Sequence, residues 1–294
     1  MKNTILDRAV QKVPAFAERA RLFESKLQLE QYAAGSIKDY CHKVAAFVSY
    51  LGKLPEVCVQ ADIDYYLGVL LNRRPQPGIS YFKHTVFGLK AYYRFLGHPE
   101  PGGLVMPKVR KSKKLPRVLS EESVKQLLRC SDVYAKALLG TIYDLGLRAG
   151  EACDLKWTDI DMNRGMVLIH GKGRKDRYVP ISKQMIKVLR YYRKRYPSHD
   201  YVFKSYGSCN KIKDDYIRKV FRTSLAAAGL DTSLTTHALR HSYACHLLEH
   251  GESIMRVKER MGHKHLSTTE IYLHVVKIEP KGSVLLVDDM FPPK

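Results

Sequence analysis

The stretch that most constrains the fold of this chain is its middle, residues 97–120, with the sequence GHPEPGGLVMPKVRKSKKLPRVLS. Four prolines and three glycines disfavour both helix and strand there, so the stretch predicts an extended connection between two separately folded parts. We expect a helical domain at residues 1–106, a basic linker at residues 107–117 and a larger domain at residues 118–294.

The chain as a whole is strongly basic, with 50 Lys and Arg against 29 Asp and Glu and a net charge of +21. Cations that contact phosphates release condensed counterions, so this excess favours a nucleic-acid partner. An anionic membrane surface is the alternative, although the sequence has no run of about 18 apolar residues to span a bilayer and no signal-peptide core. Six scattered cysteines without a CxxC pair favour reduced thiols and hence a cytoplasmic protein.

Apolar residues recur at steps of three and four through much of the sequence, which predicts a mainly α-helical protein. In SIKDYCHKVAAFVSYLGK, Ser36 is a candidate N-cap and Gly52 a C-terminal stop. Only GMVLIHGKGRKDRYVPIS changes to a strand-like pattern, with β-prone residues at 167–169 and 178–181 around a glycine-rich turn. The predicted fold class is therefore mainly α with a small antiparallel β-sheet.

Two groups of basic residues are candidate DNA contacts. One lies in the linker, where a solvated loop is the alternative interpretation, and the other lies at the tip of the predicted hairpin. The linker group is Arg110, Lys111, Lys113 and Lys114, and the hairpin group is Arg174 and Lys175.

Arg148 and Lys172 are the first candidates for chemistry. Arg148 follows a helix stop at Gly146, where its guanidinium and the free N–H groups of a new helix can face one phosphate. Lys172 lies between two glycines at the hairpin tip, and glycines let a backbone approach a ligand closely. A solvated arginine and an ordinary turn lysine are the alternatives.

The segment TTHALRHSYACHLLEHG is more specific. A threonine at position 235 or 236 can cap a helix on which His237 and Arg240 share one face. The spacing of His237, His241 and Cys245 also fits a zinc site. We disfavour zinc because the HExxH glutamate is missing and because Arg240 would point a positive charge at the metal.

Tyr272, in HKHLSTTEIYLHV, is the available hydroxyl nucleophile, although a tyrosine among apolar neighbours is more often part of the core. The candidate residues are arginines, histidines, a lysine and this tyrosine, without the several acids that metal nucleases need. Such a set of donors suits a dianionic phosphorane transition state. A side-chain nucleophile then replaces activated water.

With these motifs in order, the chain resembles the tyrosine recombinase (phage integrase) superfamily. The matching segments are LRAGE with Arg148, GKGRKDR with Lys172, HALRHSYACHLLEHG with His237 and Arg240, and MGHKHLSTTEIYLHV with His263 and Tyr272. These segments run across the whole second domain, and SIKDYCHKVAAFVSYL resembles the family's helical core-binding (SAM-like) domain. The resemblance implies that a tyrosine-recombinase catalytic domain follows a DNA-contacting domain.

The same resemblance implies a site-specific recombinase that cuts and rejoins DNA without metal, cofactor or ATP. Arg148 and Arg240 would bind the non-bridging oxygens of the scissile phosphate. His237 and His263 would donate hydrogen bonds or help to move a proton, and Glu151 would support the site structurally.

Tyr272 would attack the phosphate to form a 3′-phosphotyrosine, while Lys172 would protonate the leaving 5′-hydroxyl group. The 5′-hydroxyl of another strand would then reverse the step. The implied partner is double-stranded DNA with paired half-sites, bound by a homo-oligomer that forms a tetramer on DNA. The segment after the tyrosine would pack on a neighbouring protomer.

An integrase of a mobile element is the favoured subtype. The tail VVKIEPKGSVLLVDDMFPPK resembles that of integron integrases more than a Xer tail, yet the insertion typical of integron integrases is absent before the second arginine motif. A type IB topoisomerase and a DNA-binding regulator with a decayed site are the alternatives. The separate basic N-terminal domain disfavours the first, and the intact set of six candidate catalytic residues disfavours the second.

Overall fold

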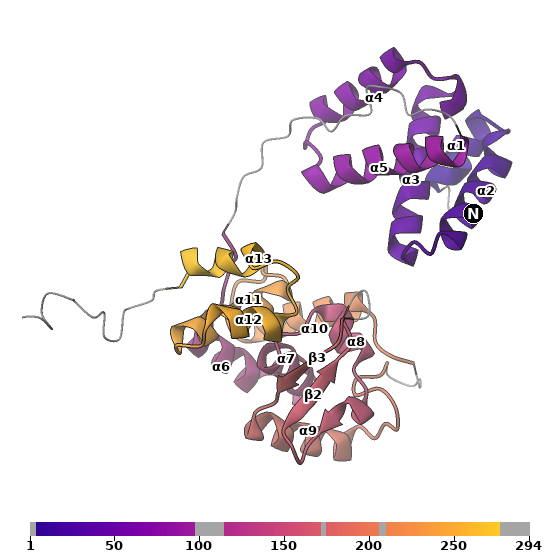
Figure 1. Ribbon diagram of the computed structural model, residues 1–294. Helices are drawn as coiled ribbons and strands as arrows, with labels where there is room; N and C mark the ends of the chain where they lie inside the picture. The colour runs from indigo at the N-terminus through magenta and orange to yellow at the C-terminus, as the bar shows by residue number, and fades with distance from the viewer. Residues whose placement is uncertain (1–3, 98–114, 172–174, 206–209, 277–294) are drawn as a thin grey trace, which may run out of the picture. The chain divides into compact units, whose positions relative to one another are not determined.

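The computed structural model describes residues 4–97, 115–171, 175–205 and 210–276 of the chain. The chain divides into two compact units, residues 1–113 and 114–294 (Figure 1). Each unit has its own apolar core and is described by itself.

The first unit consists of α-helices connected by short turns. Their bounds are α1 Ile5–Lys12, α2 Phe16–Leu29, α3 Ala34–Leu51, α4 Gln60–Asn72 and α5 Ile79–Phe95, with a 3₁₀ turn η1 at Pro55–Val57. Aromatic rings fill the core of this bundle, where Phe23 and Tyr92 meet edge to face at a centroid distance of 5.1 Å. Such edge-to-face pairs add to the stability that burial provides.

The sequence predicted both the start and the end of helix α3. It ends at Gly52, whose φ of +70° gives the left-handed conformation that glycine adopts most easily, as predicted. The expected N-cap at Ser36 is wrong, because the helix begins two residues earlier at Ala34. The backbone N–H of Ser36 donates to the carbonyl of Ala33, so Ser36 already lies inside the first turn.

The second unit combines helices with one small sheet. The elements before the last strand are α6 Glu121–Cys130, α7 Val133–Asp144, α8 Ala149–Asp154, η2 Trp157–Asp159, β1 Ile160–Asp161 and β2 Met166–Ile169. The remaining elements are β3 Arg177–Pro180, α9 Lys183–Arg195, α10 Asp214–Ala227, α11 His237–Glu249, α12 Ile254–Met261, α13 Ser267–Glu270 and η3 Ile271–His274. The mainly α fold with a small antiparallel sheet is therefore confirmed.

The sheet has the strand order β1-β2-β3 with antiparallel pairing throughout. Val167 of β2 pairs with Val179 of β3, and both side chains are buried, which confirms the predicted hairpin and fixes its register. Strand β1 was not predicted, because two residues are too few to show a period. None of the described helices is both long and apolar enough to cross a bilayer.

Candidate functional site

Arg148 occupies the N-cap position of α8, two residues after Gly146. Gly146 has a φ of +59°, and a Cβ atom there would overlap the ring of Tyr243, so both backbone conformation and space require glycine. The backbone N–H of Arg148 donates to Oε2 of Glu151 at 2.8 Å, and its Nη1 donates to Oε1 at 2.8 Å. The carboxylate of Glu151 therefore holds the guanidinium of Arg148 at the start of the short helix α8.

Glu151 forms ion pairs with three arginines. Nη1 and Nη2 of Arg177 donate to its two oxygens at 3.0 and 2.9 Å, and Nη1 of Arg240 lies 3.7 Å from Oε2. Burial raises the pKa of Glu151, but the hydrogen bonds and charge of Arg177, with further support from Arg148 and Arg240, outweigh it and hold the pKa at about 2. The carboxylate is thus ionised at neutral pH and fixes the arginines around it.

The substitution Glu151→Gln is expected to lower the free energy of unfolding of the second unit by roughly 3 kcal/mol at neutral pH. Removal of the carboxylate leaves the buried arginine charges without a partner. A pKa held below its unfolded value stabilises above pH 4.5, and this contribution is lost as the pH falls toward 2. The difference between the two proteins should therefore shrink over that range. Urea unfolding followed by the fluorescence of Trp157, the single tryptophan of the chain, measures it.

Asp154→Asn is the matched control for that measurement. Asp154 lies on the same short helix, but its ion pair with Lys211 is exposed to solvent. Exposed pairs contribute roughly 0–1 kcal/mol, so this variant should remain close to the parent. Equal losses in both variants would contradict the assignment of Glu151 as the buried anchor.

Arg240 extends from α11 into the interior, and only 3% of its surface is exposed. Its Nη1 donates to the carbonyl of Gly146 and its Nη2 to the carbonyl of Met261. Burial lowers the pKa of Arg240 to about 10, so the guanidinium stays charged at neutral pH. Two backbone carbonyls from separate segments thus fix its orientation.

Tyr272 lies on η3 and is buried, with 2% of its surface exposed. Its hydroxyl lies 3.0 Å from Nδ1 of His241, and its ring is nearly parallel to that of His263, at an interplanar angle of 16° and a centroid distance of 6.4 Å. Burial raises the pKa of Tyr272 to about 12, against the opposing charge of Arg240. The phenol is therefore protonated at neutral pH and needs a base in order to act as a nucleophile.

His241 and His263 are neutral bases next to this phenol. Burial is the main cause that lowers the pKa of each to about 4, and the charge of Arg240 contributes to the shift. Nδ1 of His263 lies 2.9 Å from Oγ1 of Thr269, a hydrogen bond that fixes the ring. An imidazole that is neutral at pH 7 can accept a proton, which an imidazolium cannot.

His237 is the first residue of α11 and is exposed. The structure places it at one end of the site, with its ring centroid 6.2 Å from that of His241. His237 and Arg240 lie three positions apart on α11, as expected, with His237 exposed at the helix start and Arg240 buried. Thr236, one of the two threonines expected to cap this helix, occupies the N-cap position but makes no side-chain capping hydrogen bond.

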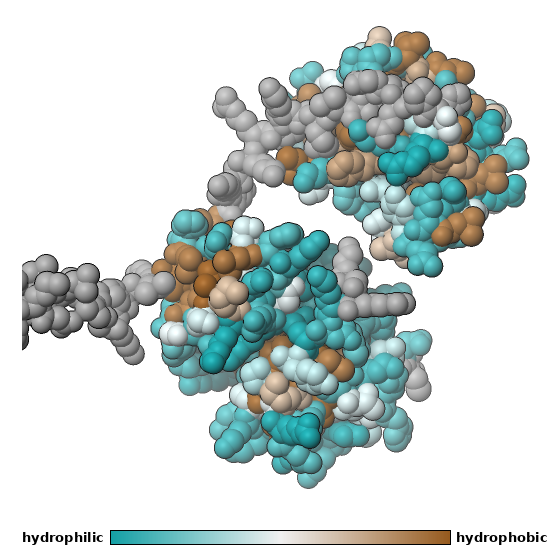
Figure 2. All heavy atoms as spheres, in the orientation of Figure 1, coloured by the Kyte–Doolittle hydropathy of each residue, from teal (hydrophilic) through white to brown (hydrophobic). Residues whose placement is uncertain are grey.

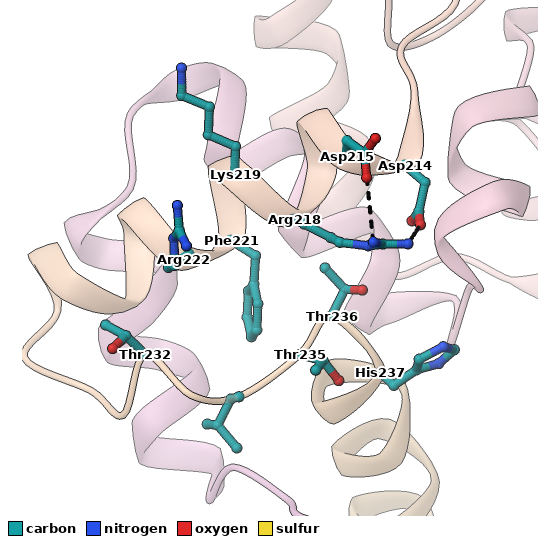
Figure 3. Close-up of a pocket in the computed structure, with 11 residues that line it drawn as sticks. Asp214, Asp215, Arg218, Lys219, Phe221, Arg222, Thr232, Thr235, Thr236 and His237 are labelled. Atoms are coloured by element: carbon teal, nitrogen blue, oxygen red, sulfur yellow. Dashed lines mark hydrogen bonds and ion pairs between the residues drawn. The ribbon is translucent and has the colours of Figure 1, made fainter. Parts of the chain in front are cut away.

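A pocket opens beside His237, between α10 and the loop that leads into α11 (Figure 3). Arg218 is held there by Asp214 and Asp215. Lys219 and Arg222, which also line the pocket, make no ion pair within the described part of the chain. The positive charge that is free for a ligand therefore lies with these two residues.

Several predicted residues lie outside the described part of the chain, namely Lys172, Arg174, Arg110, Lys111, Lys113 and Lys114. Lys175 is described and exposed. A Cβ atom at Gly171 would overlap the carbonyl of Lys175. This glycine therefore allows a close approach of the backbone to another part of the same chain, whereas the expectation was an approach to a ligand. Among the described residues, no group of three His, Cys, Asp or Glu side chains could hold a metal ion.

Two residues of the site were not recognised in the sequence. Arg177 looks like an ordinary strand residue, although it binds Glu151 and its Nε donates to the carbonyl of Arg260 at 2.7 Å. For His241 the sequence pattern suggests only a zinc ligand. Its position next to Arg240 and four residues after His237 was the available signal.

Comparisons with known proteins match this chain to integrases and recombinases. Residues 117–278 match the model of the Phage integrase family. The chain is 31% identical over 260 residues to integrase/recombinase y4qK of Sinorhizobium fredii, covering 87% of this chain and 84% of that protein. It is 34% identical over 238 residues to tyrosine recombinase XerC of Halalkalibacterium halodurans, covering 74% of this chain and 78% of that protein.

A solved structure extends this similarity to the fold. The XerH site-specific recombinase bound to a palindromic difH substrate, in a post-cleavage complex, matches with a TM-score of 0.71 and 20% identity. The match covers 94% of this chain and 95% of that chain.

Proposed function

Because the chain belongs to the phage integrase family of tyrosine recombinases, and is thus a site-specific enzyme that transfers DNA strands, we propose that Tyr272 is its nucleophile. The observation that carries this proposal is the buried hydroxyl of Tyr272, which lies beside the neutral base His241 and the fixed cation Arg240. Trapping of a covalent DNA–protein adduct tests it.

In the proposed first step, Tyr272 Oη forms a bond to the scissile phosphorus and the bond from phosphorus to the 5′-oxygen breaks. Arg148, Arg240 and His263 stabilise the charge on the non-bridging oxygens. Glu151 supports this role, because it orients Arg148 directly and neutralises only part of the local positive charge. His237, exposed at the start of α11, contributes a further hydrogen bond.

Two protons move in this step. The phenol proton passes to Nδ1 of His241, and Lys172 protonates the departing 5′-oxygen. The 3′-phosphotyrosine keeps the energy of the original ester, so attack by the 5′-hydroxyl of another strand reverses the step without ATP. Each residue then returns to its starting protonation state.

The variant His241→Asn is expected to slow cleavage by roughly 10² at pH 7, because an amide cannot accept a proton. The parent rate should be flat from pH 5 to neutral pH, since the pKa of His241 lies near 4. The variant rate should instead rise with pH, because the phenol must then ionise by itself. Single-turnover adduct formation on a nicked substrate measures both profiles.

His265→Asn is the matched control, because His265 is exposed and makes no contact with Tyr272 in the described structure. It should keep the parent rate and profile. If His241→Asn also keeps the flat profile of the parent, another group accepts the proton.

We also propose that the partner is double-stranded DNA with paired half-sites, bound by a homo-oligomer that is a tetramer on DNA. The charge of the chain supports this, as do the cations Lys219 and Arg222 beside His237. The linker and hairpin groups, with Arg110, Lys113 and Lys175 among them, are proposed to contact the backbone. The helical first unit is proposed to contact the same DNA, and a mobile element is the proposed setting.

The tail at residues 281–294 lies outside the described residues and is proposed to bind a neighbouring protomer. Figure 2 shows apolar side chains gathered over α13 and η3, where Ile271 and Leu273 are exposed on either side of the buried Tyr272. An exposed apolar surface of this kind, on the last described residues before the tail in the sequence, supports an intermolecular contact.

Deletion of residues 281–294 is expected to leave the fold and the affinity for one half-site nearly unchanged. Cooperative filling of the second half-site and strand exchange should fall sharply, because the contact between protomers is lost. A gel-shift titration of a paired site measures this, with a single half-site as the control. Full cooperativity in the shortened chain would mean that the tail folds on its own protomer.

A further inference from the structure

A cavity of about 430 Å³ lies in the second unit, away from the site described above. The start of α7, the C-terminal end of α9 and the start of α10 surround it. None of the proposed catalytic residues lines it. The residues that matter here are Tyr134, Tyr192, Tyr196, Tyr216, Arg195 and Lys204.

Four tyrosines form the aromatic walls of this cavity. The ring of Tyr134 lies 5.8 Å from that of Tyr192, 5.7 Å from that of Tyr196 and 5.9 Å from that of Tyr216, in each case edge to face. Tyr192 and Tyr196 are stacked at 5.2 Å. Aromatic surfaces of this kind bind planar rings by stacking, whatever the exact ring.

Two cations lie at the same cavity without an acidic partner. Neither Arg195 nor Lys204 makes a side-chain ion pair or hydrogen bond within the described part of the chain. The carboxylate of Asp132, which also lines the cavity, accepts from the backbone N–H of Ala135 at 2.7 Å and caps α7. The cavity therefore offers free positive charge to an anion.

One polar atom in the wall lacks a partner. The hydroxyl of Tyr192 is buried and makes no hydrogen bond in the described structure, whereas the hydroxyl of Tyr134 donates to the carbonyl of Lys204 at 3.4 Å. A buried hydroxyl without a partner destabilises a protein unless something supplies one. A polar atom on a bound ligand would do so.

We propose that this cavity is a second binding site, which takes a nucleotide. The base stacks on the tyrosines, and the phosphate pairs with Arg195 and Lys204. The volume is within the range of small-molecule sites, which combine apolar and aromatic walls with a few polar groups. The ligand is either a free nucleotide or one nucleotide of a single-stranded DNA segment, since both present a base and a phosphate.

Trp157 provides a direct readout, because it is the single tryptophan of the chain and its ring lies 6.5 Å from that of Tyr192. Titration of the full chain with AMP, under selective excitation of Trp157, should give a saturable change with a Kd of about 1 mM or tighter. Adenosine and inorganic phosphate should each bind at least about tenfold more weakly, since each lacks half of the recognised groups.

The variants Arg195→Ala and Lys204→Ala should each weaken AMP binding by about tenfold. Arg190→Ala is the matched control, because Arg190 is exposed on the same helix and does not line the cavity. Formation of the covalent DNA adduct should be unchanged in all three variants, so failure of this proposal is distinct from failure of the proposed function. Equal urea midpoints exclude loss of the fold.

Competition identifies the source of the nucleotide. Displacement of AMP by single-stranded oligothymidylate assigns the site to a DNA strand, and absence of displacement assigns it to a free nucleotide. An AMP titration without saturation, or equal AMP affinity in Arg195→Ala and the parent, would overturn the proposal. Equal affinity for adenosine and AMP would overturn it as well.

Discussion

The variant Tyr272→Phe is expected to bind DNA with the affinity of the parent and to form no covalent adduct at all. Phenylalanine keeps the buried ring, which packs in a small apolar cluster with Cys245, Val257 and Met261. Only the hydroxyl is lost, and with it the hydrogen bond to His241. No other group of the site can form the phosphodiester bond to the 3′ end, so the loss is complete rather than partial.

A nicked suicide substrate, which lets the cleaved 5′ fragment diffuse away, traps the adduct, and SDS gel electrophoresis then separates it from free DNA. Gel shift without SDS measures binding of the same DNA. Tyr243→Phe is the matched control, because Tyr243 is also buried in this apolar cluster and has no proposed role in chemistry. The adduct should persist in this control. An SDS-resistant adduct in Tyr272→Phe would falsify the assignment of the nucleophile.

The burial of Tyr272 bears on an ambiguity in the sequence. A tyrosine between Ile271 and Leu273 fits a core residue as well as a nucleophile, and the structure shows that its ring is buried. The ring is enclosed like a core residue, while Ile271 and Leu273, its apolar neighbours in sequence, are exposed. The hydroxyl lies beside His241 and within the field of Arg240, which supports the proposed role of Tyr272 as the nucleophile.

Patterns among neighbouring residues predicted those parts of the fold that interactions between neighbouring residues determine. Two short β-prone runs around Val167 and Val179 are joined by a glycine-rich turn, which predicts a hairpin, and Gly52 ends α3 through its own backbone freedom. The apolar pattern does not single out helices α1 and α2, and it predicts a cap at Ser36 although α3 begins earlier. The start of a helix depends on the preceding turn, which the apolar period does not report.

In the candidate site, too, local features could be predicted from the sequence and long-range contacts could not. Arg148 at a helix start and Gly146 before it could be inferred from sequence, because a turn and an N-cap are local features. The binding of Arg177 to Glu151 joins β3 to α8 across 26 positions, and no local pattern encodes such a contact. His241 was missed because its partner, Tyr272, lies 31 positions away.

Contacts join the described residues of the hairpin that precede and follow residues 172–174. Nδ1 of His170 lies 3.0 Å from Oδ2 of Asp176, and its Nε2 lies 3.3 Å from Oδ1 of Asp159. The backbone N–H of Gly171 donates to Oδ1 of Asp176 at 3.2 Å. These contacts hold the two ends of the hairpin together on either side of the proposed acid.

Lys172→Ala is therefore expected to slow cleavage by roughly 10² to 10⁴, the range for loss of a general acid, without loss of DNA affinity. The 5′-oxygen is a poor leaving group unless it is protonated as its bond to phosphorus breaks. A substrate with sulfur at the 5′-bridging position needs no proton, because a thiolate leaves readily. Sulfur should therefore restore much of the rate to Lys172→Ala.

The same substrate should not rescue Arg148→Ala. Arg148 is proposed to stabilise charge on the non-bridging oxygens, and sulfur at the bridging position does not replace that charge. Single-turnover cleavage of paired oxygen and sulfur substrates gives the ratio for each variant, and Lys175→Ala serves as the neighbouring control. Rescue of Lys175→Ala in place of Lys172→Ala would transfer the acid role to Lys175, since only the residue that supplies the proton becomes dispensable when the leaving group needs none.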